Sequence, residues 1–123
     1  ENLDIVLDFG KKGEKIIVDI FEGKPEIEVK TEKDKWLSSG NIAIEYRYKG
    51  KPSCISITKA KWWIHILTLD GAVKYSFIFP VSVLKRKLKW IISEGKGRLT
   101  KGGDDNQSSL ALLPIKEIIR NEL

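Results

Sequence analysis

Alternating apolar and polar residues in two short segments limit the fold of this chain more than any other feature. In residues 25–32 the side chains of Ile27, Val29 and Thr31 share one side of an extended chain, and charged side chains share the other. Because successive side chains of a strand point to opposite faces, this pattern predicts a half-buried strand with the apolar side inward. Residues 41–48, NIAIEYRY, alternate in the same way and predict a second strand.

The segment before the first strand, residues 14–21, fits two structures. Its β-branched residues favour a strand. The same residues also fit a helix with Glu14 outside and an apolar stripe of Ile16, Ile17, Ile20 and Phe21. Gly23 and Lys24 then form a two-residue loop that is typical of a tight hairpin. We therefore expect a β-hairpin whose second strand carries Glu28 and Lys30.

That hairpin would bring two acidic side chains together. Asp19 would lie directly opposite Glu28, with Cβ atoms about 5 Å apart. Carboxylates at that distance repel each other unless a cation lies between them, and a divalent ion would remove the repulsion. Lys30, one strand step from Glu28, would lie beside the ion. If residues 14–21 are helical, Asp19 leaves this geometry and Glu14 approaches the strand instead. An ordinary solvated hairpin with balanced charges is the competing interpretation.

The rest of the chain predicts a mixture of strands and helices. Residues 59–67 follow Thr58, a suitable helix N-cap, and fit either a short helix or a strand. Residues 74–80 predict a strand that ends at Pro80, and Ser82 caps an amphipathic helix over residues 83–94. A polar loop covers residues 95–109, and Pro114 opens a terminal helix. Strands followed by helices indicate an α+β fold in one domain, residues 1–123.

Composition narrows the classes of protein. The net charge of +5 suits a partner such as nucleic acid, although a lysine-rich surface alone explains it equally well. One cysteine, Cys54, and one histidine, His65, exclude an internal disulfide and a usual zinc site, and favour a cytoplasmic setting. No apolar run reaches the roughly 18 residues of a membrane span. Abundant Lys and Glu with scarce Asn and Gln favour a thermophilic source. Because the chain does not begin with Met, we expect residues before Glu1.

Several stretches occur in a recognisable order. They are Gly13-Glu14, EVKT at 28–31, GNIAIEY at 40–46, GKPS at 50–53, TKAKWW at 58–63 and KGGDDNQSS at 101–109. This ordered set resembles small phage and archaeal-virus members of the PD-(D/E)xK nuclease superfamily, which includes restriction endonucleases and archaeal Holliday-junction resolvases. The resemblance implies a restriction-endonuclease-like α+β fold: a central mixed β-sheet, a β-hairpin carrying the Glu-x-Lys motif, and flanking helices. It also implies a viral or archaeal source and, from the resolvase relatives, a homodimer.

The same resemblance assigns roles to individual residues. Glu28 matches the second acidic ligand of a Mg²⁺ or Mn²⁺ ion, and the carbonyl of Val29 completes the site. Lys30 matches the catalytic lysine. Asp19 would be the first acidic ligand if the hairpin forms, whereas Glu14 matches a glutamate that some members supply from a helix. The residues alone leave Glu14 and Asp19 as alternatives.

Other residues are candidates for contact with DNA. Trp36 lies in a charged segment between Lys35 and Leu37, where an aromatic ring suits base stacking or a wedge between bases. The lysines that we expect to meet phosphates are Lys33, Lys35, Lys85 and Lys101. His65 suggests a general base, but its apolar neighbours favour a structural role. Glu45 either faces the same cleft as Glu28 or is an ordinary surface residue. Cys54 is expected to be inert.

Two functions follow from the sequence. The first is a metal-dependent endonuclease that hydrolyses phosphodiester bonds of duplex, branched, nicked or single-stranded DNA. The second is a catalytically inactive protein of the same fold that binds nucleic acid or another partner. Three departures from the family pattern favour the second: Val18 replaces the proline before Asp19, Cys54 replaces a glycine and Lys61 replaces an aspartate.

Overall fold

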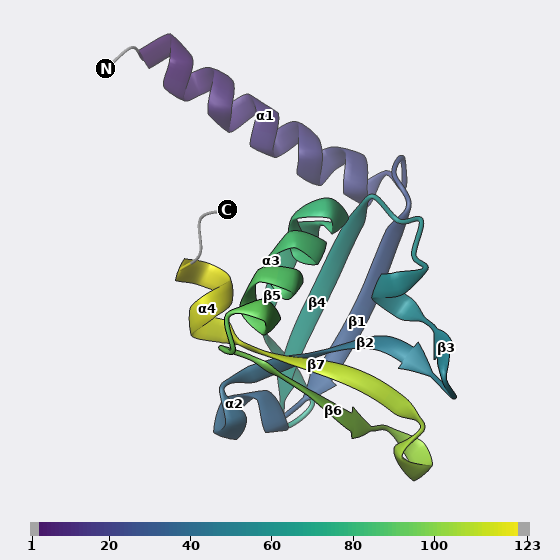
Figure 1. Ribbon diagram of the computed structural model, residues 1–123. Coiled ribbons are helices and arrows are strands. Elements are labelled where there is room, and N and C mark those ends of the chain that lie inside the picture. The colour runs from purple at the N-terminus through teal and green to yellow at the C-terminus, as the bar shows by residue number, and fades with distance from the viewer. Residues whose placement is uncertain (1–2, 121–123) are drawn as a thin grey trace.

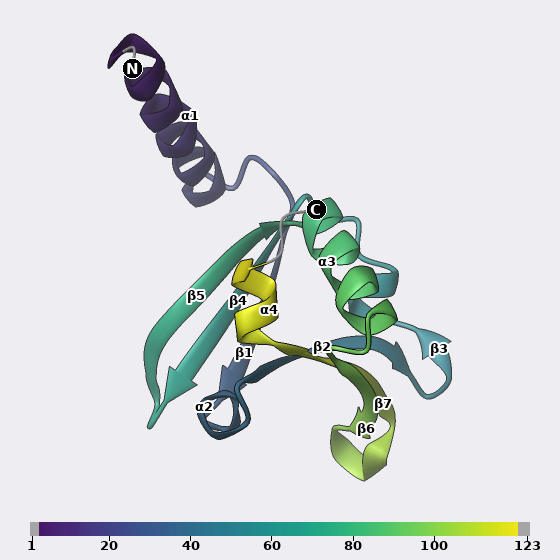
Figure 2. The same ribbon diagram turned by 60° about the vertical axis from the view of Figure 1, so that its left-hand side comes forward.

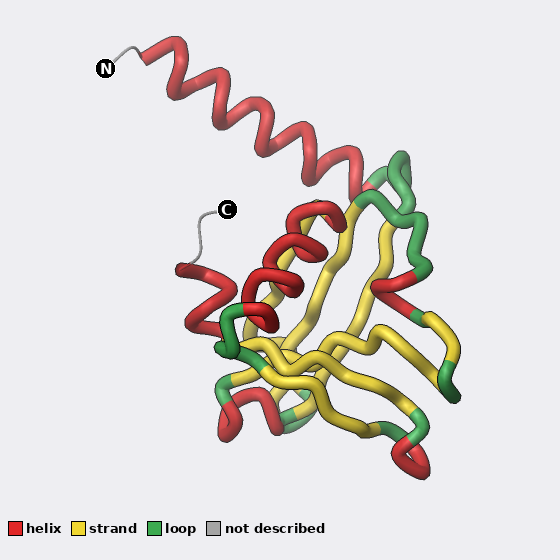
Figure 3. Tube along the Cα trace, viewed as in Figure 1, coloured by secondary structure: helices red, strands yellow, loops and turns green. Residues whose placement is uncertain are grey.

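The computed structural model describes residues 3–120, with the backbone alone for residues 3–9 (Figure 1). Its elements in chain order are α1 (Leu3–Phe21), β1 (Ile27–Lys33), α2 (Lys35–Ser39), β2 (Asn41–Tyr48), β3 (Lys51–Pro52), the 3-10 turn η1 (Cys54–Ser56), β4 (Trp62–Leu69), β5 (Ala72–Pro80), α3 (Val81–Ser93), β6 (Arg98–Gly102), the 3-10 turn η2 (Asp104–Asn106), β7 (Ser108–Pro114) and α4 (Ile115–Arg120). This mixture of elements confirms the predicted α+β class, and Figure 3 shows its distribution along the chain.

The strands form two sheets rather than one central sheet. The first has the order β1-β4-β5, with β1 parallel to β4 and β5 antiparallel to it. The second has the order β3-β2-β7-β6, and each neighbouring pair is antiparallel. Only the three-stranded sheet is therefore mixed. Figure 2 shows α3 and α4 in the angle between the two sheets, while α1 projects away from them.

The predicted hairpin is wrong. Residues 14–21 are the last turns of α1, and β1 pairs in parallel with β4 instead of with the residues before it. The apolar stripe has helical spacing, and residues 14–21 continue a 19-residue helix that begins at Leu3. Extending a helix that has already formed is favourable enough to outweigh the weak helix propensity of the β-branched residues. Gly23, at φ +70°, takes the left-handed conformation that ends a helix, and its N–H is bonded to the carbonyl of Ile20.

Other expectations are confirmed or corrected one by one. The predicted strands at 41–48 and 74–80 are β2 and β5, and the predicted helices are α3 and α4. Ser82 does not cap α3, because the helix begins at Val81 and Pro80 is its N-cap. Residues 59–67 had fitted a helix or a strand, and most of them form β4. The predicted polar loop is too long, because residues 95–109 contain β6 and the first two residues of β7. The charged segment after β1 contains the short helix α2.

The core lies between the two sheets and α3. Its fully buried apolar side chains come from four elements and include Ile42, Ile44, Trp63, Leu67, Leu84, Ile91 and Leu113. Within β4 the buried residues alternate with half-buried ones, as expected for a central strand. The face of β4 that carries Trp63 and Leu67 therefore points into the core.

The face of β1 that points inward is the charged one. Glu28, Lys30 and Glu32 are half-buried, whereas Val29 is 51% exposed. In the parallel register Lys30 is paired with His65 and Glu32 with Leu67, so these side chains share the core-facing side of the sheet. The expectation that Ile27, Val29 and Thr31 form the buried side is therefore wrong.

Among the described residues, no helix is both long enough and apolar enough to cross a membrane.

Candidate active site

A cleft between β1 and β2 gathers side chains that are far apart in the sequence. Lys30 and Glu32 of β1, Glu45 of β2, Cys54 of η1 and His65 of β4 all line a pocket of ≈ 240 Å³. A second pocket of ≈ 450 Å³ adjoins it, since Cys54 lines both. Glu28 and Thr58 line this second pocket. The cleft therefore joins the Glu-x-Lys motif of β1 to an acidic residue of the neighbouring sheet.

Glu28 and Lys30 lie next to each other on the same face of β1. The Nζ atom of Lys30 is 3.6 Å from Oε2 of Glu28, and both side chains keep about a third of their surface accessible, at 38% and 33%. Thr58 donates a hydrogen bond of 3.3 Å to Oε1 of Glu28. This ion pair is accessible to a ligand, and Thr58 fixes its carboxylate.

Glu45 is fixed by three donors. Its Oε2 atom accepts hydrogen bonds from Ser53 and Cys54, both 2.9 Å long, and its Oε1 atom accepts one of 2.6 Å from Ser108. Burial alone would raise the pKa of Glu45, but these hydrogen bonds and the charge of Lys30 lower it. A carboxylate has about four acceptor positions, so Oε1 keeps one for a further partner.

Cys54 shapes the wall between the two pockets. Its φ of +45° lies in the left-handed region, which glycine adopts without strain. Burial raises the pKa of the Cys54 thiol, and the hydrogen bond to Glu45 raises it further. The thiol is therefore a proton donor to Glu45 at neutral pH and a poor nucleophile, which agrees with the predicted inert role.

Glu32 connects three strands behind Lys30. Its Oε2 atom accepts a hydrogen bond of 2.9 Å from the backbone N–H of Ala43 in β2 and also contacts Nε2 of His65 in β4. His65 is 1% exposed, and its Nδ1 accepts a hydrogen bond of 3.1 Å from Trp63. That bond leaves Nε2 as the protonated nitrogen, which donates to Glu32. Glu32 lies two residues after Lys30 on β1, and Ala43 lies two residues before Glu45 on β2.

Two of the predicted acidic ligands lie elsewhere. Asp19 is on α1, where it pairs with Lys15 at 2.9 Å and with Lys24 at 3.3 Å. The hydrogen bond from Lys15 is the main reason that the pKa of Asp19 is lowered, and Lys24 adds to it. Glu14 is also on α1 and is exposed. Neither residue lines the cleft that Lys30 and Glu45 share, because α1 leaves the body of the protein (Figure 1).

Of the five residues predicted to contact DNA, Trp36 is buried and the four lysines are exposed. Trp36 is 5% exposed, donates a hydrogen bond of 2.7 Å to the carbonyl of Thr68 and packs edge-on against Tyr75, so its prediction as a base-stacking residue is wrong. The exposed lysines are Lys33, Lys35, Lys85 and Lys101. Lys85 lines two pockets, whereas Lys101 donates a hydrogen bond to Ser109.

The donor set of the cleft suits a hard divalent ion that protein and substrate hold together. Within residues 3–120, no group of three or more His, Cys, Asp or Glu side chains forms a complete metal site. The cleft offers the accessible carboxylate of Glu28 and the open position on Glu45. Mg²⁺ commonly takes one or two protein carboxylates and completes its shell with water and substrate phosphate. Glu28 and Glu45 are therefore the two side chains of the cleft that could hold such an ion.

Two residues of this cleft, Glu45 and Glu32, are not assigned to it by the sequence alone. Glu45 was an even choice between cleft and surface, because nothing local shows that β2 passes close to β1. Glu32 lies two positions after Lys30, so the alternation that selected Glu28 and Lys30 also places Glu32 on their face. His65 was correctly expected to be structural, but its partner Glu32 is 33 residues away.

Comparisons with protein-family models, with curated proteins and with solved structures each found no match to this chain. The arrangement of the cleft and the order of the sequence motifs are therefore the two observations that bear on function.

Proposed function

We propose that this protein is a metal-dependent endonuclease that hydrolyses phosphodiester bonds of DNA in the cleft between β1 and β2. One observation carries the proposal. Glu28 and Lys30 from β1 share adjoining pockets with Glu45 from β2, although Glu45 is 15 residues beyond Lys30 in the chain. Two carboxylates beside an ammonium group are the side chains that metal-assisted phosphodiester hydrolysis uses.

Each residue has a defined task in this proposal. Glu28 and Glu45 would hold Mg²⁺ or Mn²⁺, and Val29 would add its backbone carbonyl as the family resemblance implies. When bound, the ion would supply Lewis-acid activation of the scissile phosphate and of the attacking water. Lys30 binds a non-bridging phosphate oxygen and stabilises the negative charge that grows there in the transition state. The hydrogen bonds of Glu45 keep it ionised and in one orientation.

DNA is the substrate class that the charge favours. The chain carries 22 Lys and Arg against 17 Asp and Glu, and exposed lysines attract a polyanion. Lys33 ends the motif strand β1, Lys35 begins α2, and Lys101 lies one residue before the end of β6. These positions suit contacts with phosphates of duplex, branched or single-stranded DNA.

We propose in addition that a second copy of the chain covers two apolar surfaces. The described part of α1 exposes Ile16, Ile17 and Phe21, with 85% of Phe21 accessible. The outer face of the β1-β4-β5 sheet exposes Val29 and Ile78, and Figure 2 shows no helix against that face. Exposed apolar patches on this scale mark interaction sites. A homodimer would bury the helix surface of one copy on the sheet of the other.

Cleavage assays test the nuclease proposal directly. Supercoiled, single-stranded and four-way-junction DNA are incubated with the protein in the presence of Mg²⁺ and in the presence of EDTA. We expect metal-dependent cleavage that falls roughly 10²- to 10³-fold in each of Glu28→Ala, Lys30→Ala and Glu45→Gln. Matched controls are Glu94→Gln and Lys74→Ala, which remove exposed charges outside the cleft and should cleave like wild type. Full cleavage by Glu28→Ala would refute the assigned site.

A second candidate function is DNA binding without cleavage. Cys54 and Lys61 favour it, because they stand at positions where the family that the chain resembles has glycine and aspartate. In that case the same assays show binding to DNA, no cleavage with Mg²⁺, and no effect of Glu28→Ala on affinity.

A further inference from the structure

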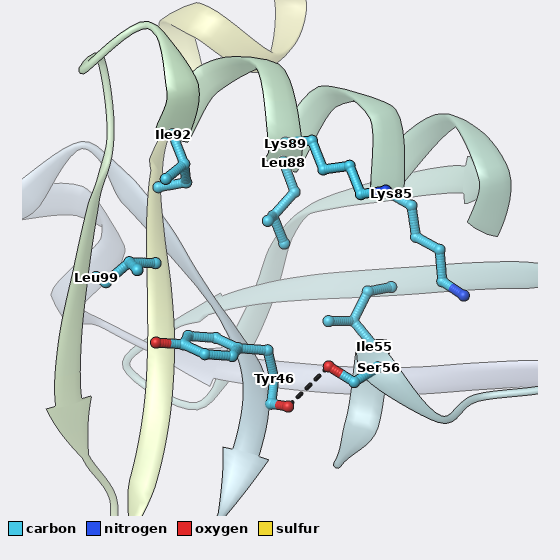
Figure 4. Close-up of a pocket in the computed structure, with 8 residues that line it drawn as sticks. All are labelled: Tyr46, Ile55, Ser56, Lys85, Leu88, Lys89, Ile92 and Leu99. Carbon is cyan, nitrogen blue, oxygen red and sulfur yellow. Dashed lines mark hydrogen bonds between the residues drawn. The ribbon is translucent and has the colours of Figure 1, made fainter. Parts of the chain in front are cut away.

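An apolar pocket lies on the α3 side of the second sheet, beside the proposed active site. Its volume is ≈ 470 Å³. Figure 4 shows the ring of Tyr46 along its floor, Leu88 and Ile92 above it, and Leu99 at one end. Lys85 and Lys89, both exposed, lie at the other end beside Ile55 and Ser56. The pocket thus combines an aromatic and aliphatic interior with two ammonium groups at its edge.

A third pocket links this pocket to the one that Glu28 lines, through residues that it shares with each of them. Lys85 also lines a neighbouring pocket of ≈ 320 Å³, together with Lys59 and Lys61. That pocket shares Thr58, Lys59 and Ala60 with the pocket of Glu28. The four lysines Lys59, Lys61, Lys85 and Lys89, which we call the basic track, therefore lie along one series of adjoining pockets. The series ends at the Glu28–Lys30 ion pair.

The chemistry of the track matches a single nucleic-acid strand. Lysines spaced along connected pockets suit successive phosphates, and an aromatic ring in an apolar pocket suits an unpaired base. A base within a duplex is stacked between its neighbours and does not enter such a pocket without being turned out of the helix. The apolar pocket and the basic track together therefore select DNA that has an unpaired segment.

We propose that the basic track binds a single DNA strand and that the apolar pocket takes one unpaired base from it, which makes single-stranded or branched DNA the preferred substrate. This inference rests on the proposed nuclease function only for its last step, the delivery of a phosphate to Glu28 and Lys30. Strand binding itself requires no metal. The two can therefore be measured separately.

The first test measures strand binding in EDTA, where cleavage does not occur. The probe is a fluorescein-labelled oligothymidylate of about 20 nucleotides, and affinity is read from fluorescence anisotropy over a range of salt concentrations. We expect the double variant Lys85→Ala/Lys89→Ala to bind at least about tenfold more weakly. The decrease of log affinity with log salt concentration should also become less steep by about 1.4, because two phosphate contacts are lost. The matched control is Lys74→Ala/Lys116→Ala, which removes the same charge from β5 and α4.

The second test separates the base from the backbone. Leu99→Glu places a carboxylate at the end of the apolar pocket, and its control is Ile119→Glu on α4, another exposed apolar residue. We expect Leu99→Glu to weaken binding of the oligothymidylate by about five- to a hundredfold, as for loss of one stacked base. The change should be smaller for an abasic strand of the same length, because that strand has no base to insert.

The outcomes distinguish the two proposals. Equal affinities of the Lys85→Ala/Lys89→Ala variant and its control would overturn the basic track. Equal effects of Leu99→Glu on the normal and abasic strands would overturn the base pocket. If wild type binds single strands through these residues and does not cleave DNA with Mg²⁺, the track stands and the nuclease proposal fails. If wild type cleaves and the lysine variant behaves like its control, the nuclease proposal stands and this inference fails.

Discussion

Removing the carboxylate of Glu32 should destabilise the fold more than removing any exposed acid. Glu32→Ala leaves two donors without their partner: the N–H of Ala43, 2.9 Å from the carboxylate, and Nε2–H of the buried His65. A buried donor that loses its acceptor costs about 1–3 kcal/mol. His65 is such a buried donor, whereas Ala43 is half-buried and lines the cleft, so the expected loss in the free energy of unfolding is about 2–4 kcal/mol, most of it from His65. That loss is a large part of the 5–15 kcal/mol that a domain has in total.

Urea denaturation measures this loss. Tryptophan fluorescence follows unfolding, and the midpoint and slope give the free energy of unfolding in water. Both donors bond to the same oxygen, Oε2, so Glu32→Gln keeps a carbonyl acceptor for both and should lose less than Glu32→Ala. Glu26→Ala is the matched control, because the Glu26 side chain is exposed just before the same strand, and we expect a change within about 0.5 kcal/mol. If Glu32→Ala unfolds within about 1 kcal/mol of wild type, the connection of β1 to β2 and β4 through Glu32 is refuted.

Three further outcomes follow from the structure. The folded-state pKa of Glu45 lies below its ordinary value of 4.5, so its contribution to stability is complete above that pH and disappears as pH falls through the lowered pKa. In Glu45→Gln the free energy of unfolding should therefore fall less steeply with decreasing pH, as measured by urea titration at a series of pH values. Phe21→Glu should convert a dimer into a monomer in light scattering, whereas Ile119→Glu should not; an unchanged mass would exclude α1 from the interface. Asp19→Ala should cleave DNA at the wild-type rate, since Asp19 pairs with Lys15 and Lys24 outside the cleft. A large loss of cleavage would show that Asp19 belongs to the active site.

The sequence predicted the elements with strong periodicity and missed the arrangement that depends on distant partners. The alternation at 41–48 and the amphipathic helix after Ser82 correspond to β2 and α3. Residues 14–21 fit both a strand and a helix, and their β-branched content favours the strand. The structure shows that the spacing was the better guide once the helix begins upstream at Leu3.

The inward face of β1 shows why the site was only partly predictable. Alternating apolar and polar residues show that the two faces of a strand differ, and the apolar face is usually the buried one. Here the charged face is inward because Glu32 finds its partners on β2 and β4, at Ala43 and His65. These contacts span 11 and 33 residues, so no local pattern contains them. The same absence of local information explains why Glu45 was undecided and why Trp36, buried against Thr68 and Tyr75, was taken for a DNA contact.

A crystal soaked with Mn²⁺ and a short uncleavable DNA strand tests the central claim most directly, because the anomalous scattering of Mn²⁺ locates the ion independently of any activity. We expect a single strong anomalous peak in the cleft, from an ion bound by carboxylate oxygens of Glu28 and Glu45, with Lys30 on a phosphate oxygen. A Glu45→Gln crystal treated in the same way should lose most of that peak. A peak on Asp19 or Glu14, or an ion that avoids the cleft while the DNA is bound, would contradict the assignment of β1 and β2 as the two sides of the active site.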